Sequence, residues 1–447
     1  MTQRTDGPPR VLVVDGTGRG HALCRLFTRT DPDVTVYYGP GCDVVQEDRI
    51  VVADSIRVTE PETVLTFLDA HPVDFVFVSH IDGLSIGLVD ALRAAGHRTI
   101  GPTREAALLE ASKERGKRFC TDHGIPTAPY RAFTDPAGAR AYIETLPYAC
   151  VVKTDGLTPD GDGSVVCSSA EEALRAVDHF ADESGDGFHV VVEQRLSGEE
   201  VSVFALLDGE NALLLPTARD FKRTLEGDLG KNCDGMGSIA PHPSAGPDLD
   251  AEIRRTLLDP LVRGLAAEGL HFSGFLYIGA MITTDGLQVI ELNARFGDSE
   301  AQVVLPGVSS DFTELCRAVL RRQLAGREIV SDGLVRCSVA LTQGSLDPSD
   351  PEALPGWPFG AFASGQRVNG LDDVDPGEAA VYCANLRLGA GGQPVTSGGR
   401  VLHVVGSGSS LPEARARAYR GLERISFAGM RYRDDIGLTA SREKALA

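Results

Sequence analysis

Apolar positions in the first hundred residues alternate between short continuous runs and helically spaced sets. Runs at 11–14, 34–38 and 74–78 predict buried strands, and the spacing of apolar residues after Pro61 predicts a helix that begins there. Alternation of strands and helices is typical of a parallel sheet, whose ligands bind at the carboxyl ends of its strands. We therefore expect residues 1–110 to form a Rossmann-like α/β domain.

The pattern changes after about residue 103. Short apolar runs at 148–153, 190–193 and 289–293 predict further strands, separated by helices and glycine-containing loops. From about residue 330 the chain is rich in strand signals and ends in an amphipathic helix, with a hairpin predicted at Ser397-Gly398-Gly399. This combination predicts α/β and α+β structure in several domains.

Composition narrows the class of protein. The 447 residues carry 43 Lys and Arg against 63 Asp and Glu, a net charge of −20, which is opposite to that expected of a nucleic-acid or anionic-membrane binder. No apolar run approaches the roughly 20 residues of a membrane span. None of the nine cysteines forms a Cys-x-x-Cys pair, which disfavours zinc and disulfide frameworks. We expect a cytoplasmic enzyme without a nucleic-acid or membrane partner.

The first strand is followed by a glycine-rich turn. Gly16, Gly18 and Gly20 approach a dinucleotide fingerprint, but His21 stands where its third glycine belongs. A nicotinamide-dependent dehydrogenase is therefore only a minor alternative. The main interpretation is a tight strand-to-helix turn whose backbone N–H groups can bind an anion.

The strand predicted at 289–293 places polar and charged side chains on one face. Because side chains two apart on a strand point the same way, Glu291, Asn293 and Arg295 share a face if the strand continues. A carboxylate and an amide oxygen suit Mg²⁺, and an arginine binds a carboxylate or phosphate. The plain alternative is a polar edge strand that faces solvent.

Two further cues precede that strand. Lys153 ends a strand and enters a glycine-rich loop that could fold over a triphosphate, unless it only extends into solvent. Glu193 follows three valines, so this segment could present backbone groups to adenine, and Glu200 could accept from ribose hydroxyls. Two solvated acids are the alternative. The order of these features along the chain favours a nucleotide site.

The same features carry a family resemblance. The chain resembles the ATP-grasp ligases, and among them the phosphoribosylamine–glycine ligases of purine synthesis. The motifs that match are Gly101-Pro102-Thr103, Leu109-Glu110-Ala111-Ser112-Lys113, Lys153-x-Asp155-Gly156-Leu157, Asp220-Phe221-Lys222-Arg223, Glu291-Leu292-Asn293-Ala294-Arg295-Phe296-Gly297-Asp298-Ser299-Glu300 and Gly398-Gly399-Arg400-Val401-Leu402. The resemblance implies an ATP-grasp domain at 111–329 with a small lid subdomain at about 125–192, between the Rossmann-like domain and a strand-rich domain at 330–447.

The resemblance also implies a site for ATP with Mg²⁺, Mn²⁺ being the alternative ion. The implied nucleotide-binding residues are Lys113, Lys153, Glu193, Gln194, Leu196, Glu200, Gly161 and Gly163. Glu291 and Asn293 would ligate the metal. The residues implied at the reacting centre and the amino-acid substrate are Arg295, Asp298, Asp220, Lys222 and Arg223.

Departures from the family motifs occur at two places. The nucleotide loop reads Gly161-Asp162-Gly163 where the family has Gly-Lys-Gly. In the N-terminal domain the glycine turn lacks the Glu of the family's Gly-Gly-Arg-Glu-His, and Asp43 and Asp82 stand where a sugar phosphate would be repelled. The candidate amine-binding residues there are Gly18, Arg19, Asp43, His80 and Asp82.

We therefore expect an ADP-forming carboxylate–amine ligase that forms an amide through an acyl phosphate. Its substrates would be a small amino acid or other carboxylate and a small amine that is not phosphoribosylamine. The alternatives are a genuine phosphoribosylamine–glycine ligase and a non-catalytic ATP-binding regulator. A monomer or small homo-oligomer is expected.

Overall fold

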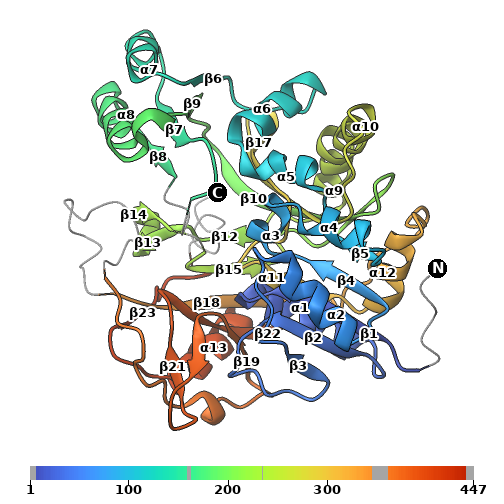
Figure 1. Cartoon of the computed structure of the whole chain (residues 1–447). Helices are drawn as coiled ribbons and strands as arrows, with labels where there is room; N and C mark the ends of the chain where they lie inside the picture. The colour runs from blue at the N-terminus through green and yellow to red at the C-terminus, as the bar shows by residue number, and fades with distance from the viewer. Residues whose placement is uncertain (1–6, 159–162, 234, 345–360, 439–447) are drawn as a thin grey trace.

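The N-terminal segment forms a five-stranded parallel sheet in the order β3-β2-β1-β4-β5. The structure, a computed structural model, describes residues 7–158, 163–233, 235–344 and 361–438. The strands are β1 (Arg10–Asp15), β2 (Thr35–Pro40), β3 (Ile50–Val52), β4 (Phe75–Val78) and β5 (Thr99–Ile100). The helices are α1 (Gly18–Thr30), α2 (Pro61–Ala70), α3 (Ile81–Ser85), α4 (Leu88–Ala94) and α5 (Arg104–Ala111). The apolar runs are buried because helices cover this sheet (Figure 1).

A four-stranded antiparallel sheet occupies the middle of the molecule, in the order β11-β10-β16-β17. Its strands are β10 (Glu199–Leu207), β11 (Ala212–Leu214), β16 (Gly274–Thr283) and β17 (Gly286–Asn293), and the nearby helices are α6 (Lys113–Asp122), α9 (Pro247–Ile253) and α10 (Asp259–Ala267). A π-helical turn (Arg254–Leu258) joins α9 to α10, and Pro260, which has no backbone N–H to donate, follows it in the first turn of α10. Apolar residues of this sheet and of the N-terminal helices share one core.

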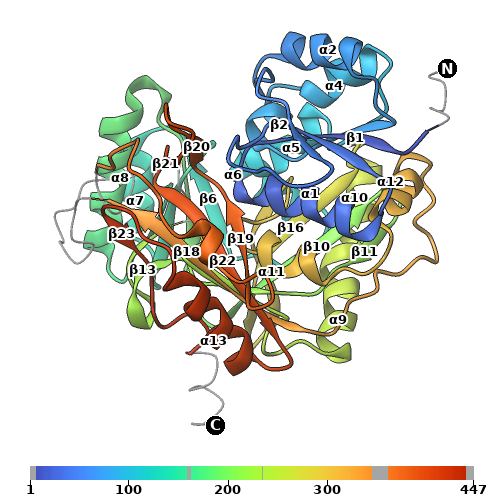
Figure 2. The ribbon, with the colours of Figure 1, turned by 90° about the horizontal axis from the view of Figure 1, so that it is seen from below.

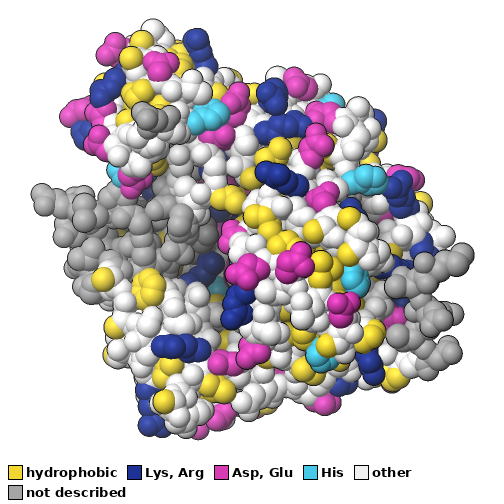
Figure 3. Space-filling view, in the orientation of Figure 1, with side chains coloured by type: hydrophobic (Ala, Val, Ile, Leu, Met, Phe, Trp, Pro, Cys, Tyr) yellow, Lys and Arg dark blue, Asp and Glu magenta, His cyan; other side chains and the backbone are white. Residues whose placement is uncertain are grey.

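A second antiparallel sheet, which we call the small sheet, has the order β6-β9-β7-β8. It comprises β6 (Tyr130–Phe133), β7 (Cys150–Thr154), β8 (Ser164–Val166) and β9 (Val190–Gln194), with helices α7 (Pro136–Ile143) and α8 (Ala170–Ser184). Its apolar residues form a core of their own. In Figures 1 and 3 this lobe stands out from the rest of the molecule, and its surface mixes acidic and basic side chains.

The C-terminal segment builds a sheet in the order β12-β15-β18-β22-β19, with β23 beside β18. Its strands are β12 (Arg219–Asp220), β15 (Gly237–Ala240), β18 (Val335–Gln343), β19 (Ala379–Cys383), β22 (Arg400–Gly408) and β23 (Met430–Arg431). The remaining elements are α11 (Ala301–Val304), α12 (Phe312–Leu320), α13 (Leu411–Leu422) and the two-stranded ladders β13 (Arg223–Leu225) with β14 (Leu229–Asn232) and β20 (Leu386–Leu388) with β21 (Pro394–Thr396). Figure 2 shows α13 packed against β18 and β22.

The predicted mixture of α/β and α+β structure is confirmed. The hairpin predicted at 397–399 is wrong, because β21 before the turn pairs with β20 whereas β22 after it pairs with β18 and β19. No helix in the described part of the chain is long and apolar enough to cross a membrane.

Candidate active site

A cleft of about 1320 Å³ lies between the N-terminal sheet, the middle sheet and the small sheet. It collects almost all of the residues predicted from sequence. Those that line it are Lys113, Lys153, Gly163, Glu193, Gln194, Leu196, Glu200, Asp220, Lys222, Arg223, Glu291, Asn293, Arg295, Asp298, Arg19, His80 and Asp82. Residues as distant in sequence as Arg19 and Asp298 thus share one cavity. We call its part beside β9 and β17, where the residues predicted to bind the nucleotide lie, the nucleotide end, and its part beside β1 and β4, where residues predicted to bind the amine lie, the amine end. Gly161 and Asp162 lie outside the described residues.

A buried ion-pair cluster lies at the nucleotide end. The Glu193 carboxylate, at the end of β9, is 2.6 Å from Lys153 Nζ and 2.5 Å from Lys117 Nζ. Burial would raise the pKa of Glu193, but the charges of Lys153 and Lys117 outweigh it and lower the pKa. The Glu193 side chain is therefore engaged by lysines, and a base would meet the backbone of this segment. Lys117 was not predicted, although it lies four residues after Lys113 on the same face of α6.

Lys113 begins α6 beside this cluster. Ser112 caps the helix by accepting from Arg115 N, and Asp155 accepts from the Ser112 hydroxyl and from Glu114 N, so the helix start is tied to the loop after β7. Lys113 Nζ donates to the Gly156 carbonyl at 2.8 Å. Burial lowers the pKa of Lys113, but nearby Glu291 opposes the shift. An anionic ligand would add a further opposing charge.

Glu291 and Asn293 lie on one face of β17, as predicted. Lys222 Nζ is 3.7 Å from Glu291 and 3.5 Å from Glu200. Burial would raise the pKa of Glu291, but the charges of Lys222, Lys153, Arg295 and Lys113 lower it to about 2. Glu291 is therefore a carboxylate throughout the physiological range.

These two residues fit a magnesium ion that carries phosphates. The amide Nδ2 of Asn293 is buried and donates to no other described atom, so it is available to a phosphate oxygen. No group of three or more His, Cys, Asp or Glu within the described residues could hold a metal by itself. Mg²⁺ needs only one or two protein oxygens when phosphates and water complete its octahedron.

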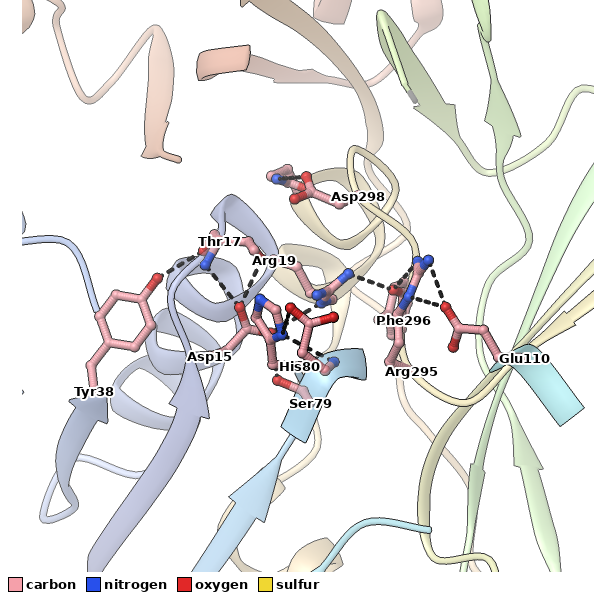
Figure 4. Close-up of polar contacts among 12 residues, drawn as sticks. Asp15, Thr17, Arg19, Tyr38, Ser79, His80, Glu110, Arg295, Phe296 and Asp298 are labelled. Atoms are coloured by element: carbon pink, nitrogen blue, oxygen red, sulfur yellow. Dashed lines mark hydrogen bonds and ion pairs between the residues drawn. The ribbon is translucent and has the colours of Figure 1, made fainter. Parts of the chain in front are cut away.

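Arg295 follows β17 and is held by Glu110, a residue that the sequence analysis assigned no role. Glu110 Oε1 accepts from Arg295 Nε at 2.9 Å (Figure 4). Its Oε2 accepts from Ala294 N at 2.7 Å. Arg295 Nη1 donates to the Phe296 carbonyl at 3.0 Å. Buried, doubly bonded Glu110 thus fixes the guanidinium at the edge of the cleft.

Asp298 is surrounded by C-terminal residues. Gln302 donates to its Oδ1 at 2.6 Å, His403 Nε2 lies 3.4 Å from the same oxygen, and Arg400 Nη2 lies 3.7 Å from Oδ2. Burial would raise the pKa of Asp298, but Arg400 and His403 lower it well below its usual range. The C-terminal sheet thereby keeps a charged carboxylate at the cleft.

Two residues predicted at the amine end do not reach the cleft. A Cβ on Gly18 would lie 2.6 Å from Gln302 Nε2, so this glycine serves close packing of α1 against the C-terminal half. Asp43 accepts from Leu388 N at 2.8 Å and ties the loop after β2 to β20. Neither residue lines the cleft, and sequence alone could not show that β20 covers this loop. A contact of either residue with the amine substrate stays a prediction. Arg19, His80 and Asp82 do line the cleft.

Comparison with known proteins accounts for this arrangement. Three family models match the chain: the phosphoribosylglycinamide synthetase N domain at 9–110, its ATP-grasp (A) domain at 111–301 and its C domain at 353–439. The chain is 37% identical to a phosphoribosylamine–glycine ligase of Vibrio cholerae over 98% of this chain and 100% of that protein. A solved structure of the phosphoribosylamine–glycine ligase of Thermotoga maritima matches with a TM-score of 0.78 at 29% identity, covering 96% of this chain and 100% of that one.

The fold extends beyond these ligases. The biotin carboxylase domain of a Hydrogenobacter thermophilus 2-oxoglutarate carboxylase, in complex with MgADP, matches with a TM-score of 0.67 at 15% identity over 95% of this chain and 92% of that one. The ATP-grasp fold is confirmed.

The expectation of an amine other than phosphoribosylamine is wrong. Further relatives, 36% and 37% identical over 97% and 98% of this chain, carry the same name as the Vibrio cholerae protein. The motif departures that suggested another amine are therefore compatible with this family's architecture. One of them, Asp43, faces a C-terminal strand instead of the cleft.

Proposed function

The chain belongs to the phosphoribosylglycinamide synthetase family of ATP-grasp, ADP-forming carbon–nitrogen ligases, and we propose that it joins glycine to phosphoribosylamine. The observation that carries this proposal is the shared cleft, in which Arg19 and His80 of the N-terminal domain face the same cavity as Glu291 and Arg295. Full-length similarity to ligases with this name supports it.

ATP supplies the phosphoryl group that activates the carboxylate, and Mg²⁺ neutralises charge on its phosphates. We assign the metal to Glu291 and Asn293 and the phosphates to Lys113 and Lys153, while the backbone of 193–196 faces the base and Glu200 the ribose. Lys153 would approach the phosphates with Glu193 behind it, so its ammonium is fixed in direction. The charges and contacts of the nucleotide end support this assignment.

At the reacting centre we assign Arg295 to the glycine carboxylate and Asp298 to its amino group. Glu110 and the Arg400–His403 pair would hold those two side chains in place. Asp220, Lys222 and Arg223 line the same wall, where Lys222 would offset negative charge on the transferring phosphoryl group. Positioning of two substrates in a water-poor cleft is the main contribution of the protein.

The test is ADP release with purified protein, ATP, Mg²⁺, glycine and phosphoribosylamine. Turnover that requires both substrates, with formation of the glycinamide ribonucleotide by mass spectrometry, would support the proposal. ADP release that proceeds equally well without phosphoribosylamine, or its absence with all substrates present, would contradict it. Glu252→Gln is a matched folding control, because Glu252 contacts Leu287 N at the outer end of β17 and lies away from the cleft.

A further inference from the structure

The carboxylate of Asp15, at the end of β1, is completely buried and accepts four hydrogen bonds. Thr17 donates its backbone N–H at 2.8 Å and its hydroxyl at 2.7 Å to Oδ1. Arg19 Nε donates at 3.1 Å and Ser79 Oγ at 2.8 Å to Oδ2 (Figure 4). One side chain therefore holds the glycine turn, the first turn of α1 and the end of β4 together. None of the family motifs matched above contains this residue.

Gly20 makes room for that carboxylate. A Cβ at Gly20 would lie 2.6 Å from Asp15 Cβ and 2.9 Å from Tyr38 Cε2, distances that real Cβ atoms do not adopt. Tyr38 is itself fixed, because its hydroxyl donates to the Thr17 carbonyl at 2.7 Å. The glycine at position 20, where the family motif has Glu, and the buried Asp15 are thus two parts of one arrangement.

Arg19 links Asp15 to the segment that follows β17, on the other side of the cleft. It is 5% exposed, and its Nη1 donates to the Phe296 carbonyl at 3.2 Å. The same carbonyl accepts from Arg295, which Glu110 holds. The two arginines, one from each side of the cleft, therefore meet at one backbone oxygen (Figure 4).

We propose that Asp15 is a positioning residue for the amine substrate: its carboxylate, in the space left by Gly20, holds Arg19 against the Phe296 carbonyl and so sets the amine end of the cleft. Asp15 does not line the cavity, whereas Thr17, Arg19 and His80 do, so it acts through them. The substrate named here rests on the proposed function. The ion pair through which Asp15 positions Arg19 does not.

The test is steady-state kinetics of Asp15→Asn with each substrate varied in turn. Asparagine keeps the shape and one acceptor but turns an NH₂ group toward Arg19 or Ser79, so a charge-assisted hydrogen bond is lost. We expect the KM for phosphoribosylamine to rise about 10- to 100-fold, with the KM values for glycine and ATP within about twofold of wild type. Asp208→Asn is the matched control, since Asp208 is equally buried, accepts from Asn211 N and Leu324 N, and lies away from the cleft.

The other possible results would count against the positioning role of Asp15 or separate it from the proposed function. Unchanged phosphoribosylamine kinetics in Asp15→Asn would overturn it, as would a parallel loss in all three substrates that matches the Asp208→Asn control. If the wild-type protein shows no turnover, the proposed function fails separately. A thermal double-mutant cycle of Asp15→Asn with Arg19→Gln then tests whether Asp15 and Arg19 interact. Non-additive shifts of Tm would support the positioning of Arg19 by Asp15, and additive shifts would overturn it.

Gly20→Ala tests the steric half of the arrangement. The added methyl would displace Asp15 or Tyr38, so Tm should fall and the KM for phosphoribosylamine should rise with it. Gly187→Ala is the control, because a Cβ there meets no atom within 4 Å, its backbone is not in the left-handed region, and it lies away from the cleft. A loss at Gly20 that lowers Tm without affecting the amine would overturn the link between the two residues.

Discussion

The two ends of the cleft are built on different principles. At the nucleotide end, four lysines (Lys113, Lys117, Lys153 and Lys222) lie among three carboxylates (Glu193, Glu200 and Glu291), so these groups leave positive charge in excess for a polyanion. At the amine end, the Arg19 guanidinium donates to the Asp15 carboxylate and to the Phe296 carbonyl, so its charge is engaged within the protein. The first end attracts its ligand by charge, whereas the second is a fixed shape.

This difference explains why departures from the family motifs at the amine end suggested a changed substrate wrongly. A substitution among the nucleotide residues would alter the charge that the ligand meets directly. A substitution at the amine end can be absorbed by a neighbour, as Asp15 fills the space that a side chain at position 20 would need. Absent motif residues are therefore weaker evidence for a changed substrate where side chains act mainly by packing.

The largest effect is expected at the nucleotide end. Glu291→Gln removes the charge that four cations surround and one ligand that we assign to Mg²⁺, so kcat should fall about 10³-fold. Steady-state ADP release measures it, with circular dichroism to verify folding. The KM for phosphoribosylamine should stay within about twofold of wild type, because the amine end is independent. A kcat within about tenfold of wild type would remove Glu291 from the metal site.

The ion-pair cluster should matter more for stability than for turnover. Lys117→Met leaves the buried Glu193 with Lys153 alone, and breaking such a pair costs about 3 kcal/mol of unfolding free energy. Urea unfolding measures it. The double variant Lys117→Met with Glu193→Gln should recover part of the loss, because no uncompensated carboxylate remains. A loss below about 1 kcal/mol would show that water reaches the cluster.

Sequence patterns predicted the structure correctly where it depends on residues that are close together in the chain. The apolar runs predicted β1, β2 and β4, and the two-residue spacing of Glu291 and Asn293 placed both on one face of β17. Lys117 was missed because its spacing from Lys113 gains meaning only when β9 brings Glu193 opposite α6.

The remaining errors concern partners that are distant in sequence. The turn at 397–399 has hairpin chemistry, but strand pairing depends on β18 and β20, which local residues do not encode. The structural contact of Asp43 could likewise not be predicted, because its donor Leu388 N lies 345 residues later in the sequence. Glu110 had no local signal at all, since its role requires Arg295 beside it.

His403 lies where the C-terminal sheet meets the cleft, and it predicts a pH dependence. Burial lowers the pKa of His403 from 6.5 to about 4, with Arg400 assisting and Asp298 opposing. Between these values the unfolded chain binds the proton that the folded protein excludes, so stability falls as pH drops below 6.5. Between about pH 6.5 and pH 5, the free energy of unfolding should therefore fall by about 2 kcal/mol less in His403→Asn than in the wild type.

Urea titrations at several pH values measure this difference. His179→Asn is the control, because His179 is a partly exposed residue of α8 that pairs with Glu183 one turn away. The control should retain the wild-type slope. Equal slopes for wild type and His403→Asn would show that His403 does not titrate in this way.

The smallest effect separates the two aspartates that had both suggested a repelled phosphate. Asp82 lines the cleft and its side chain is 53% exposed, so Asp82→Asn should lower the KM for phosphoribosylamine about twofold, and less at high salt. Asp43→Asn keeps an acceptor for Leu388 N and should leave that KM unchanged. Salt-dependent kinetics of both variants measure the contrast. An equal response of the two would mean that long-range charge, and not contact with the cleft, sets affinity at the amine end.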